Sequence, residues 1–137
     1  MTRPTDTSPV SLHVLIVDDN AASAQTTGWM VELMGHTYAL ADGAGAAMAS
    51  AAKTTPDVVM LDIGLPGTNG FEICLGMKAL PDMADTVFIA HSGYGDKRYR
   101  TQAAEVGFAH FLLKPFEADD LEAMLAQAVE RKASRGN

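Results

Sequence analysis

Several features that mark other classes of protein are missing from this sequence. The single cysteine, Cys74, cannot form a disulfide within the chain. No apolar run approaches the roughly 18 to 20 residues of a membrane-spanning helix, and the opening MTRPTDTSPV has no apolar signal core. With 10 Lys and Arg against 17 Asp and Glu, the net charge of −7 disfavours binding to phosphate backbones. We therefore expect a cytoplasmic protein without membrane insertion or direct nucleic-acid binding.

The length and composition indicate one folded unit. The 137 residues are 47% hydrophobic, which is enough for one core but leaves no room for a second domain. We expect a flexible N-terminal lead over residues 1–10, a domain over 11–132 and a frayed polar tail over 133–137. Cys74 is expected to be a small buried hydrophobe.

Short β-rich runs alternate with longer helical patterns along the chain. Strands are predicted over 13–17, 37–41, 57–61, 86–91 and 110–113. Helices are predicted over 21–34, 44–52, 71–80, 96–107 and about 119–132. Asn20 is expected to cap the first helix and Gly35 to end it. This alternation predicts an α/β fold, a doubly wound five-stranded parallel sheet with five helices covering both faces.

Polar residues follow four of the five predicted strands. In doubly wound sheets the ligand site lies beyond the carboxyl ends of the strands, so these residues should meet at one edge. They are Asp18 and Asp19 after the first strand, Asp62 after the third, Ser92 after the fourth and Lys114 after the fifth. Each alone could cap a helix or belong to a turn. Their agreement across four strands predicts a common site.

The predicted site carries unbalanced negative charge. Two carboxylates about 4 Å apart repel by roughly 4 kcal/mol at an effective dielectric near 20, and three acids with one lysine leave a charge of about −2. Oxygen ligands with no histidine or cysteine nearby favour Mg²⁺ over zinc. The four histidines (His13, His36, His91 and His110) are expected to be structural or incidental.

Four motifs together carry a family resemblance. VDDN, LDIGLPGTNGFE, FIAHSGYG and FLLKPF, in this order and spacing, resemble the receiver domain of two-component response regulators. The resemblance spans about residues 11–132 and implies a flavodoxin-like (receiver) architecture. It implies that Asp62 accepts a phosphoryl group from a histidine kinase or a histidine phosphotransfer protein.

The resemblance also implies a set of metal ligands. Asp19 should bind Mg²⁺ directly and Asp18 mainly through water. Asp62 and the backbone carbonyl of Gly64 complete the implied ligand set.

Other residues match the switch positions of the family. Ser92 and Lys114 are implied to contact the phosphoryl group, and the Lys114–Pro115 peptide bond resembles one that is cis in the family. Phe111 aligns with the aromatic switch position, where many relatives have tyrosine. The surface formed by the fourth helix, fifth strand and fifth helix is the implied signalling surface for a downstream protein target.

The output of such a chain has several interpretations. We expect a stand-alone regulator, a relay or a phosphate sink that acts through protein contacts, since no output domain is visible in the sequence. The sequence DIGLPG is similar to the corresponding segment of receivers that are fused to sensor kinases. We expect a protein that catalyses its own phosphorylation and dephosphorylation, not a turnover enzyme.

Three alternatives belong to other classes. An aspartate-based, Mg²⁺-dependent phosphatase usually has a second acid two residues after its nucleophile, where this chain has Gly64. A flavin-binding protein would need a hydroxyl-rich phosphate loop, but DDNAAS is acidic. A receiver-like interaction module that is never phosphorylated would be signalled by loss of Asp62, Lys114 or an acidic-pair member, and all are present.

Overall fold

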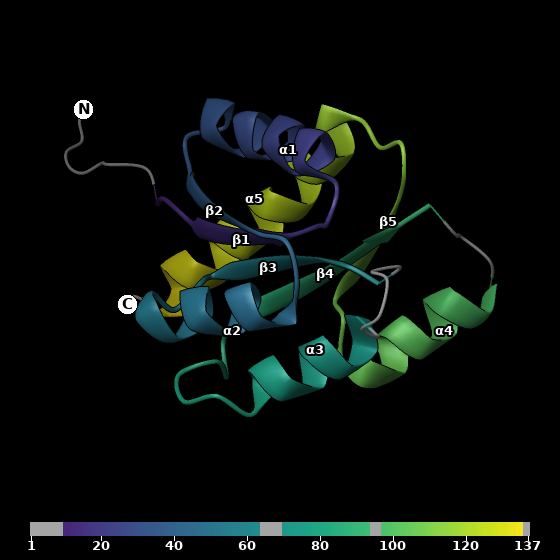
Figure 1. Ribbon diagram of the computed structural model, residues 1–137. Helices are drawn as coiled ribbons and strands as arrows, with labels where there is room; N and C mark the ends of the chain where they lie inside the picture. The colour runs from purple at the N-terminus through teal and green to yellow at the C-terminus, as the bar shows by residue number, and fades with distance from the viewer. Residues whose placement is uncertain (1–9, 64–69, 94–96, 136–137) are drawn as a thin grey trace, which may run out of the picture.

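The computed structural model describes residues 10–63, 70–93 and 97–135. Within these ranges five strands alternate with five helices (Figure 1). The strands are β1 (His13–Val17), β2 (Thr37–Ala41), β3 (Val58–Asp62), β4 (Val87–Ser92) and β5 (His110–Leu113). The helices are α1 (Ala21–Leu33), α2 (Ala44–Lys53), α3 (Gly70–Lys78), α4 (Lys97–Val106) and α5 (Ala118–Arg135).

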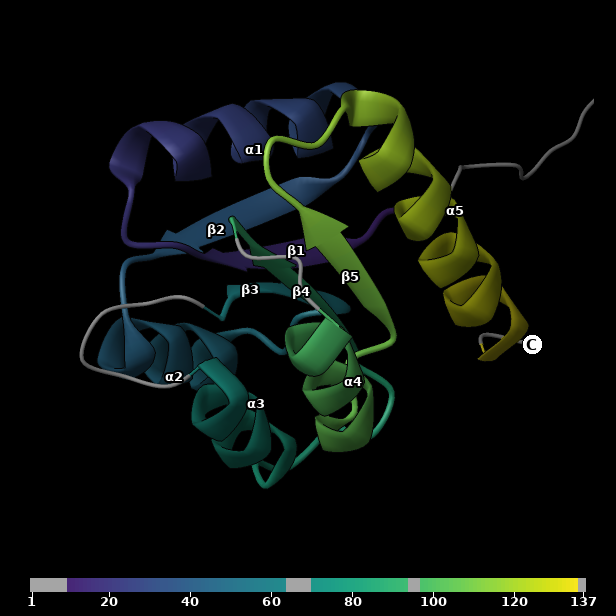
Figure 2. The same cartoon turned by 90° about the vertical axis from the view of Figure 1, so that its right-hand side faces the viewer.

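All neighbouring strands pair in parallel, in the order β2-β1-β3-β4-β5. Helices α1 and α5 cover one face of the sheet, and α2, α3 and α4 cover the other (Figures 1 and 2). The predicted doubly wound parallel sheet is therefore confirmed. The chain leaves β1 toward β2 and returns to β3 on the other side of β1, so the carboxyl ends of β1 and β3 flank the topological switch point.

Alternate residues of each strand feed two separate cores. On β1, Leu15 and Val17 face α2, α3 and α4, whereas Val14 and Ile16 face α1 and α5. All four side chains are fully buried. The strands that are buried on both faces are accordingly continuous apolar runs, the pattern from which they were predicted.

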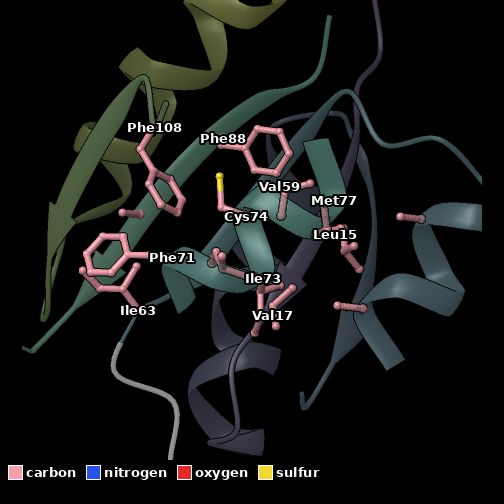
Figure 3. Packing of buried hydrophobic residues seen from close by; sticks show 14 of the residues in the cluster. Leu15, Val17, Val59, Ile63, Phe71, Ile73, Cys74, Met77, Phe88 and Phe108 are labelled. Carbon is pink, nitrogen blue, oxygen red and sulfur yellow. The ribbon is translucent and has the colours of Figure 1, made fainter. Parts of the chain in front are cut away.

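The core beneath α3 and α4 contains three phenylalanine rings (Figure 3). Phe108 makes edge-to-face contacts with Phe71 and Phe88, at ring-centroid distances of 6.2 and 6.3 Å. Cys74 lies among these rings, and burial raises the pKa of its thiol to about 11. The expectation that Cys74 is a buried hydrophobe is confirmed.

The ends of the elements follow local hydrogen bonding. The Asn20 side chain accepts a hydrogen bond from the backbone N–H of Ser23 at 2.9 Å and caps α1, as predicted. Gly35 follows the helix in the left-handed region at φ +94°, where glycine carries no steric cost.

Several element boundaries differ from the prediction by one to three residues. Strand β3 runs from 58 to 62, not 57 to 61, so Asp62 is its last residue. Helix α3 ends at Lys78 because the backbone N–H groups of the next two residues turn back to carbonyls three positions earlier, which tightens the chain. Helix α5 continues to Arg135, past the expected domain end at residue 132. The domain limits themselves stay predictions.

In the described parts of the chain, no helix combines the length and apolar character needed to cross a membrane.

Helix α1 packs against β2 through a close contact between Gly28 and Tyr38. A Cβ atom on Gly28 would lie 2.5 Å from Cε2 of the Tyr38 ring. The ring is held in place because the Gln25 side-chain amide donates a hydrogen bond to its hydroxyl at 2.8 Å. The contact therefore leaves room for glycine alone.

We predict that Gly28→Ala lowers the free energy of unfolding by about 1–2 kcal/mol, because the strain of overpacking exceeds the gain in helix propensity. Gly45→Ala is the matched control: it also lies in a helix, but its Cβ meets open space, so stability should be unchanged or higher. Urea denaturation of both variants measures the difference. Equal stability of Gly28→Ala and wild type would show that the contact is not tight.

Candidate functional site

The strand register brings two aspartates side by side at the carboxyl edge of the sheet. Val17 of β1 pairs with Leu61 of β3, so the residues that follow, Asp18 and Asp62, occupy equivalent positions on adjacent strands. The backbone N–H of Asp18 donates to the carbonyl of Ala41 at 2.9 Å and continues the pairing with β2 by one step. Both carboxylates therefore project from rigid strand ends at the switch point.

Lys114 joins these two carboxylates. Its Nζ lies 2.9 Å from Oδ2 of Asp18 and 2.9 Å from Oδ2 of Asp62. Its backbone N–H donates to the Ser92 carbonyl at 2.8 Å, which holds the residue against the end of β4. The Lys114–Pro115 bond is cis, as the resemblance implied. Four predicted site residues, from four segments of the chain, thus meet at one edge.

The site is buried but charged. The exposed fractions of Asp18 and Asp62 are 2% and 9%. Burial alone would raise the pKa of Asp18, but hydrogen bonds from Lys114 and from the backbone N–H of Asn20 outweigh it and hold the pKa below its ordinary value. Burial likewise opposes the charge on Lys114, and the two carboxylates outweigh it and raise the lysine pKa. Two negative charges therefore face one positive charge at neutral pH.

This donor set fits a hard divalent cation. One ammonium leaves the two buried carboxylates with a net charge of −1, and carboxylate oxygens are the ligands that Mg²⁺ prefers. Asp18 and Asp62 are the residues that would hold the ion. Asp19 is exposed and lies with Asp18 on the lining of an open pocket of about 470 Å³ beside β2. Gly64, the implied carbonyl ligand, lies outside the described residues.

The two predicted switch residues lie at the ends of β4 and β5. Ser92 is fully buried, and strand alternation places it on the same face as Ala90, toward α3 and α4. Phe111 is partly buried against the same core, and the guanidinium carbon of Arg100 lies 4.9 Å from its ring centroid. Phe111 is therefore in contact both with the core and with a cation on α4.

His91 is a site neighbour that the sequence analysis missed. It pairs in register with Asp62, and one of its ring nitrogens lies within 4.8 Å of a carboxylate oxygen of Asp18 and of Asp62. The expectation of an acidic site with no histidine nearby is wrong. The available signal was its place just before Ser92 at the end of a strand, but only the register between β3 and β4 reveals its neighbour.

The environment of His91 keeps its ring neutral. Burial, reinforced by the positive charge of Lys114, lowers the pKa of His91 to about 4, and the two carboxylates oppose the shift less strongly. The ring packs edge-to-face against Phe116 at 6.4 Å. Within the part of the chain that the structure describes, neither ring nitrogen has a hydrogen-bond partner.

Two of the other histidines have the structural role that was expected. The Nδ1 atom of His36 accepts a hydrogen bond from the backbone N–H of Leu12 at 3.1 Å. The Nδ1 atom of His13 lies 3.0 Å from the Thr37 hydroxyl oxygen.

An open groove adjoins the charged site. It has a volume of about 580 Å³ and lies between the first turns of α1 and the segment after β5. Asn20, Ala22 and Met30 contribute to one wall, and Lys114 and Phe116 to the other. The groove therefore offers an approach from solvent to the lysine that contacts both carboxylates.

Residues 14–126 match the family model described as "Response regulator receiver domain". The chain belongs to this family. The receiver fold and a role in two-component signal transduction follow from that membership. The geometry of the site, with Asp18 and Asp62 both in contact with Lys114, is consistent with this family.

The curated relatives are longer proteins. The chain is 32% identical over 128 residues to the phosphate regulon transcriptional regulatory protein PhoB of Pseudomonas aeruginosa, covering 93% of this chain and 56% of that protein. It is 29% identical over 119 residues to the transcriptional regulatory protein FixJ of Bradyrhizobium diazoefficiens, covering 87% and 57%. The chain therefore spans little more than half the length of these regulators.

Solved structures agree with the fold. The signal receiver domain of a DNA-binding response regulator from Colwellia psychrerythraea superposes with a TM-score of 0.81 at 27% identity, covering 88% of this chain and 99% of that one. A CheY-like receiver domain protein from Methanospirillum hungatei gives a TM-score of 0.80 at 24% identity, covering 91% and 99%, a likeness of fold alone.

We predict that Lys114→Met lowers the free energy of unfolding by about 1–3 kcal/mol at pH 7, and by less near pH 4. In the wild type the lowered pKa of Asp18 contributes stability above its unfolded-state pKa, and this is lost as pH falls through the folded value. Without the lysine, burial dominates and raises the pKa of Asp18, so the ionised form becomes destabilising at pH 7 and its protonation in acid relieves the loss.

Urea denaturation at both pH values measures this difference. Lys132→Met is the matched control, because Lys132 pairs with Asp57 at 3.0 Å at the opposite edge of the sheet and is more exposed, so its loss should cost less than about 1 kcal/mol. A loss for Lys114→Met that is independent of pH would contradict the proposed charge balance.

Proposed function

We propose that this chain is a phospho-accepting receiver in which Asp62 takes a phosphoryl group and the modification alters a surface for protein–protein signalling. The observation that carries the proposal is the placement of Asp62 with Asp18 and Lys114 at the switch point of the sheet. A carboxylate nucleophile, a second acid for a cation and an ammonium for the transferred charge are the groups that such a reaction needs.

The reaction is a transfer between two nucleophiles. A carboxylate oxygen of Asp62 attacks the phosphorus of a phosphohistidine, an O–P bond forms, and the N–P bond breaks to release imidazole. Lys114 would exchange its contact with Asp62 for one with a phosphoryl oxygen, which keeps its charge compensated. Bound Mg²⁺ would supply neutralisation of the carboxylate and phosphoryl oxygens. Hydrolysis of the acyl phosphate by water then restores Asp62, so the chain is modified and reset and is not a turnover enzyme.

The groove beside Lys114 suits the approach of the donor. The donor is a histidine kinase or a histidine phosphotransfer protein, and its histidine must reach a carboxylate that is largely buried. The groove is open to solvent and presents both small and apolar side chains, such as Ala22 and Met30, for a partner to contact. This role places the chain in the cytoplasm, together with its donor.

The switch would start from charge. The phosphoryl group carries about −1.5 to −2 and adds acceptor oxygens, which would draw the Ser92 hydroxyl and the lysine toward Asp62. Ser92 and Lys114 are already joined through their backbones. Movement at either residue would therefore pass to β5, to Phe111 and to the surface formed by α4, β5 and α5, where a downstream protein target would bind.

Its place in signalling has three forms: a stand-alone regulator, a relay or a phosphate sink. The chain matches a part of the signal transduction histidine-protein kinase BarA of Escherichia coli, with 28% identity over 121 residues and 13% of that protein covered. This match supports an association with a kinase or a relay.

We predict that wild-type protein incubated with Mg²⁺ and acetyl phosphate gains the mass of one phosphoryl group, and that Asp62→Asn gains none. Asp119→Asn is the matched control, because this aspartate is exposed in the first turn of α5 and should leave modification unchanged. Removing Mg²⁺ with EDTA should suppress the wild-type reaction. Intact-protein mass spectrometry gives the readout.

Two results would contradict the proposal. Modification that persists in Asp62→Asn would move the acceptor to another residue. No modification of the wild type, by acetyl phosphate or by a phosphorylated histidine kinase, would favour the alternative of a receiver-like interaction module that is never phosphorylated.

We predict that the Ser92→Ala variant still accepts the phosphoryl group but that phosphorylation has a weaker effect on the conformation of α4 and β5. The amide NMR shift changes that phosphorylation causes in α4 and β5 should be several-fold smaller than in wild type, because the hydroxyl that follows the phosphoryl group is missing. Ser50→Ala, on α2, should retain the full changes. If phosphorylation of Ser92→Ala caused amide shift changes as large as in wild type, the Ser92 hydroxyl would not be what links Asp62 to α4 and β5.

A further inference from the structure

Among the described residues, His91 is the one whose side chain has buried polar atoms without a hydrogen-bond partner. Both of its ring nitrogens are unpaired. Its exposed fraction is 1%. Buried polar groups are nearly always paired, so an unpaired one points to a missing ligand or ion. Acceptance of a phosphoryl group by Asp62 gives this imidazole no role.

The geometry gives the imidazole a specific set of neighbours. Along a strand, residues two positions apart point to the same face of the sheet. Asp18, Asp62 and His91 each lie two positions after a residue of the core beneath α1 and α5. These core residues are Ile16, Met60 and Ile89. The three side chains therefore project from the ends of β1, β3 and β4 on the same face of the sheet. One ligand atom from each lies within 4.8 Å of the other two.

These distances are close to those of a metal site. Ligands of one zinc ion lie about 2.0–2.2 Å from it, so two of them are at most about 4.4 Å apart, and about 3.4 Å apart in a tetrahedral site. Rotation of the three side chains would have to bring the ligand atoms to that spacing. The atoms are one imidazole nitrogen and two carboxylate oxygens.

We propose that Asp18, Asp62 and His91 form a binding site for a divalent transition-metal ion, with Zn²⁺ the best match to the donors. Imidazole nitrogen suits zinc and its neighbours in the transition series, whereas Mg²⁺ takes oxygen ligands. Three protein ligands leave a fourth position for water, the arrangement of an open zinc site. The proposal needs only the ligand atoms and does not rest on phosphorylation of Asp62.

Binding of zinc would compete with the other occupants of the pocket. Zinc shares Asp18 and Asp62 with the Mg²⁺ site, and its charge would displace the Lys114 ammonium that now lies between them. Zn²⁺ and Mg²⁺ would therefore compete for the same two carboxylates.

Calorimetric titration of the full chain with ZnCl₂ and, separately, MgCl₂ tests the site. His91→Leu should weaken Zn²⁺ binding by at least about tenfold and leave Mg²⁺ binding within about twofold of wild type, because only zinc uses the imidazole. His110→Gln is the matched control, since His110 lies at the start of β5, and it should bind both ions as wild type does. The Asp18→Asn variant should bind both ions more weakly than wild type does.

A second readout needs no substitution at the site. Zn²⁺ added to wild-type protein should shift the ¹⁵N resonances of the His91 ring, and an equal concentration of Mg²⁺ should not. If His91→Leu does not fold, His91→Gln takes its place in the titrations. Zinc affinity that is unchanged on loss of His91, zinc binding that depends on another histidine, or an unshifted His91 ring at saturating Zn²⁺ would each overturn the proposal.

Discussion

The contact of the Lys114 ammonium with Asp18 and Asp62 is the interaction on which the functional edge of this molecule depends. Two carboxylates this deeply buried would repel each other and lose their hydration, and a cation between them offsets both effects. The three groups come from β1, β3 and the segment after β5, so the contact also fixes distant parts of the chain relative to one another. Any group that bound these two carboxylates would compete with this contact.

Much of the fold could be read from the sequence because its signals are local. The β-branched apolar runs, the Asn20 cap and the Gly35 stop each act within a few residues, and the structure has them where they were predicted. Some of the boundaries that differed have no such local signal. The end of α3, for example, is set by a tightened turn after Lys78 that no residue type in the sequence announces.

The site was predictable to the extent that parallel strands share an edge. That rule alone brings Asp18, Asp62 and Lys114 together, and the structure joins them by direct contacts. It does not give the register, which decides that His91 lies beside Asp62. Nor does it give side-chain exposure: Asp18 is buried against Lys114, whereas Asp19, the expected direct ligand of Mg²⁺, is exposed.

The contacts of Lys132 have a mechanical consequence for α5. This residue, near the end of the helix, donates to the Ser11 carbonyl at 2.9 Å and to Asp57 at 3.0 Å, at the edge of the sheet opposite the acidic site. The beginning of the helix follows Lys114 by only a few residues. Helix α5 is thus held at two places, by the buried Leu121 and Leu125 near its beginning and by Lys132 near its end. A displacement at Lys114 that reached this helix would therefore have to repack the core under its first turns before it moved the end held by Lys132.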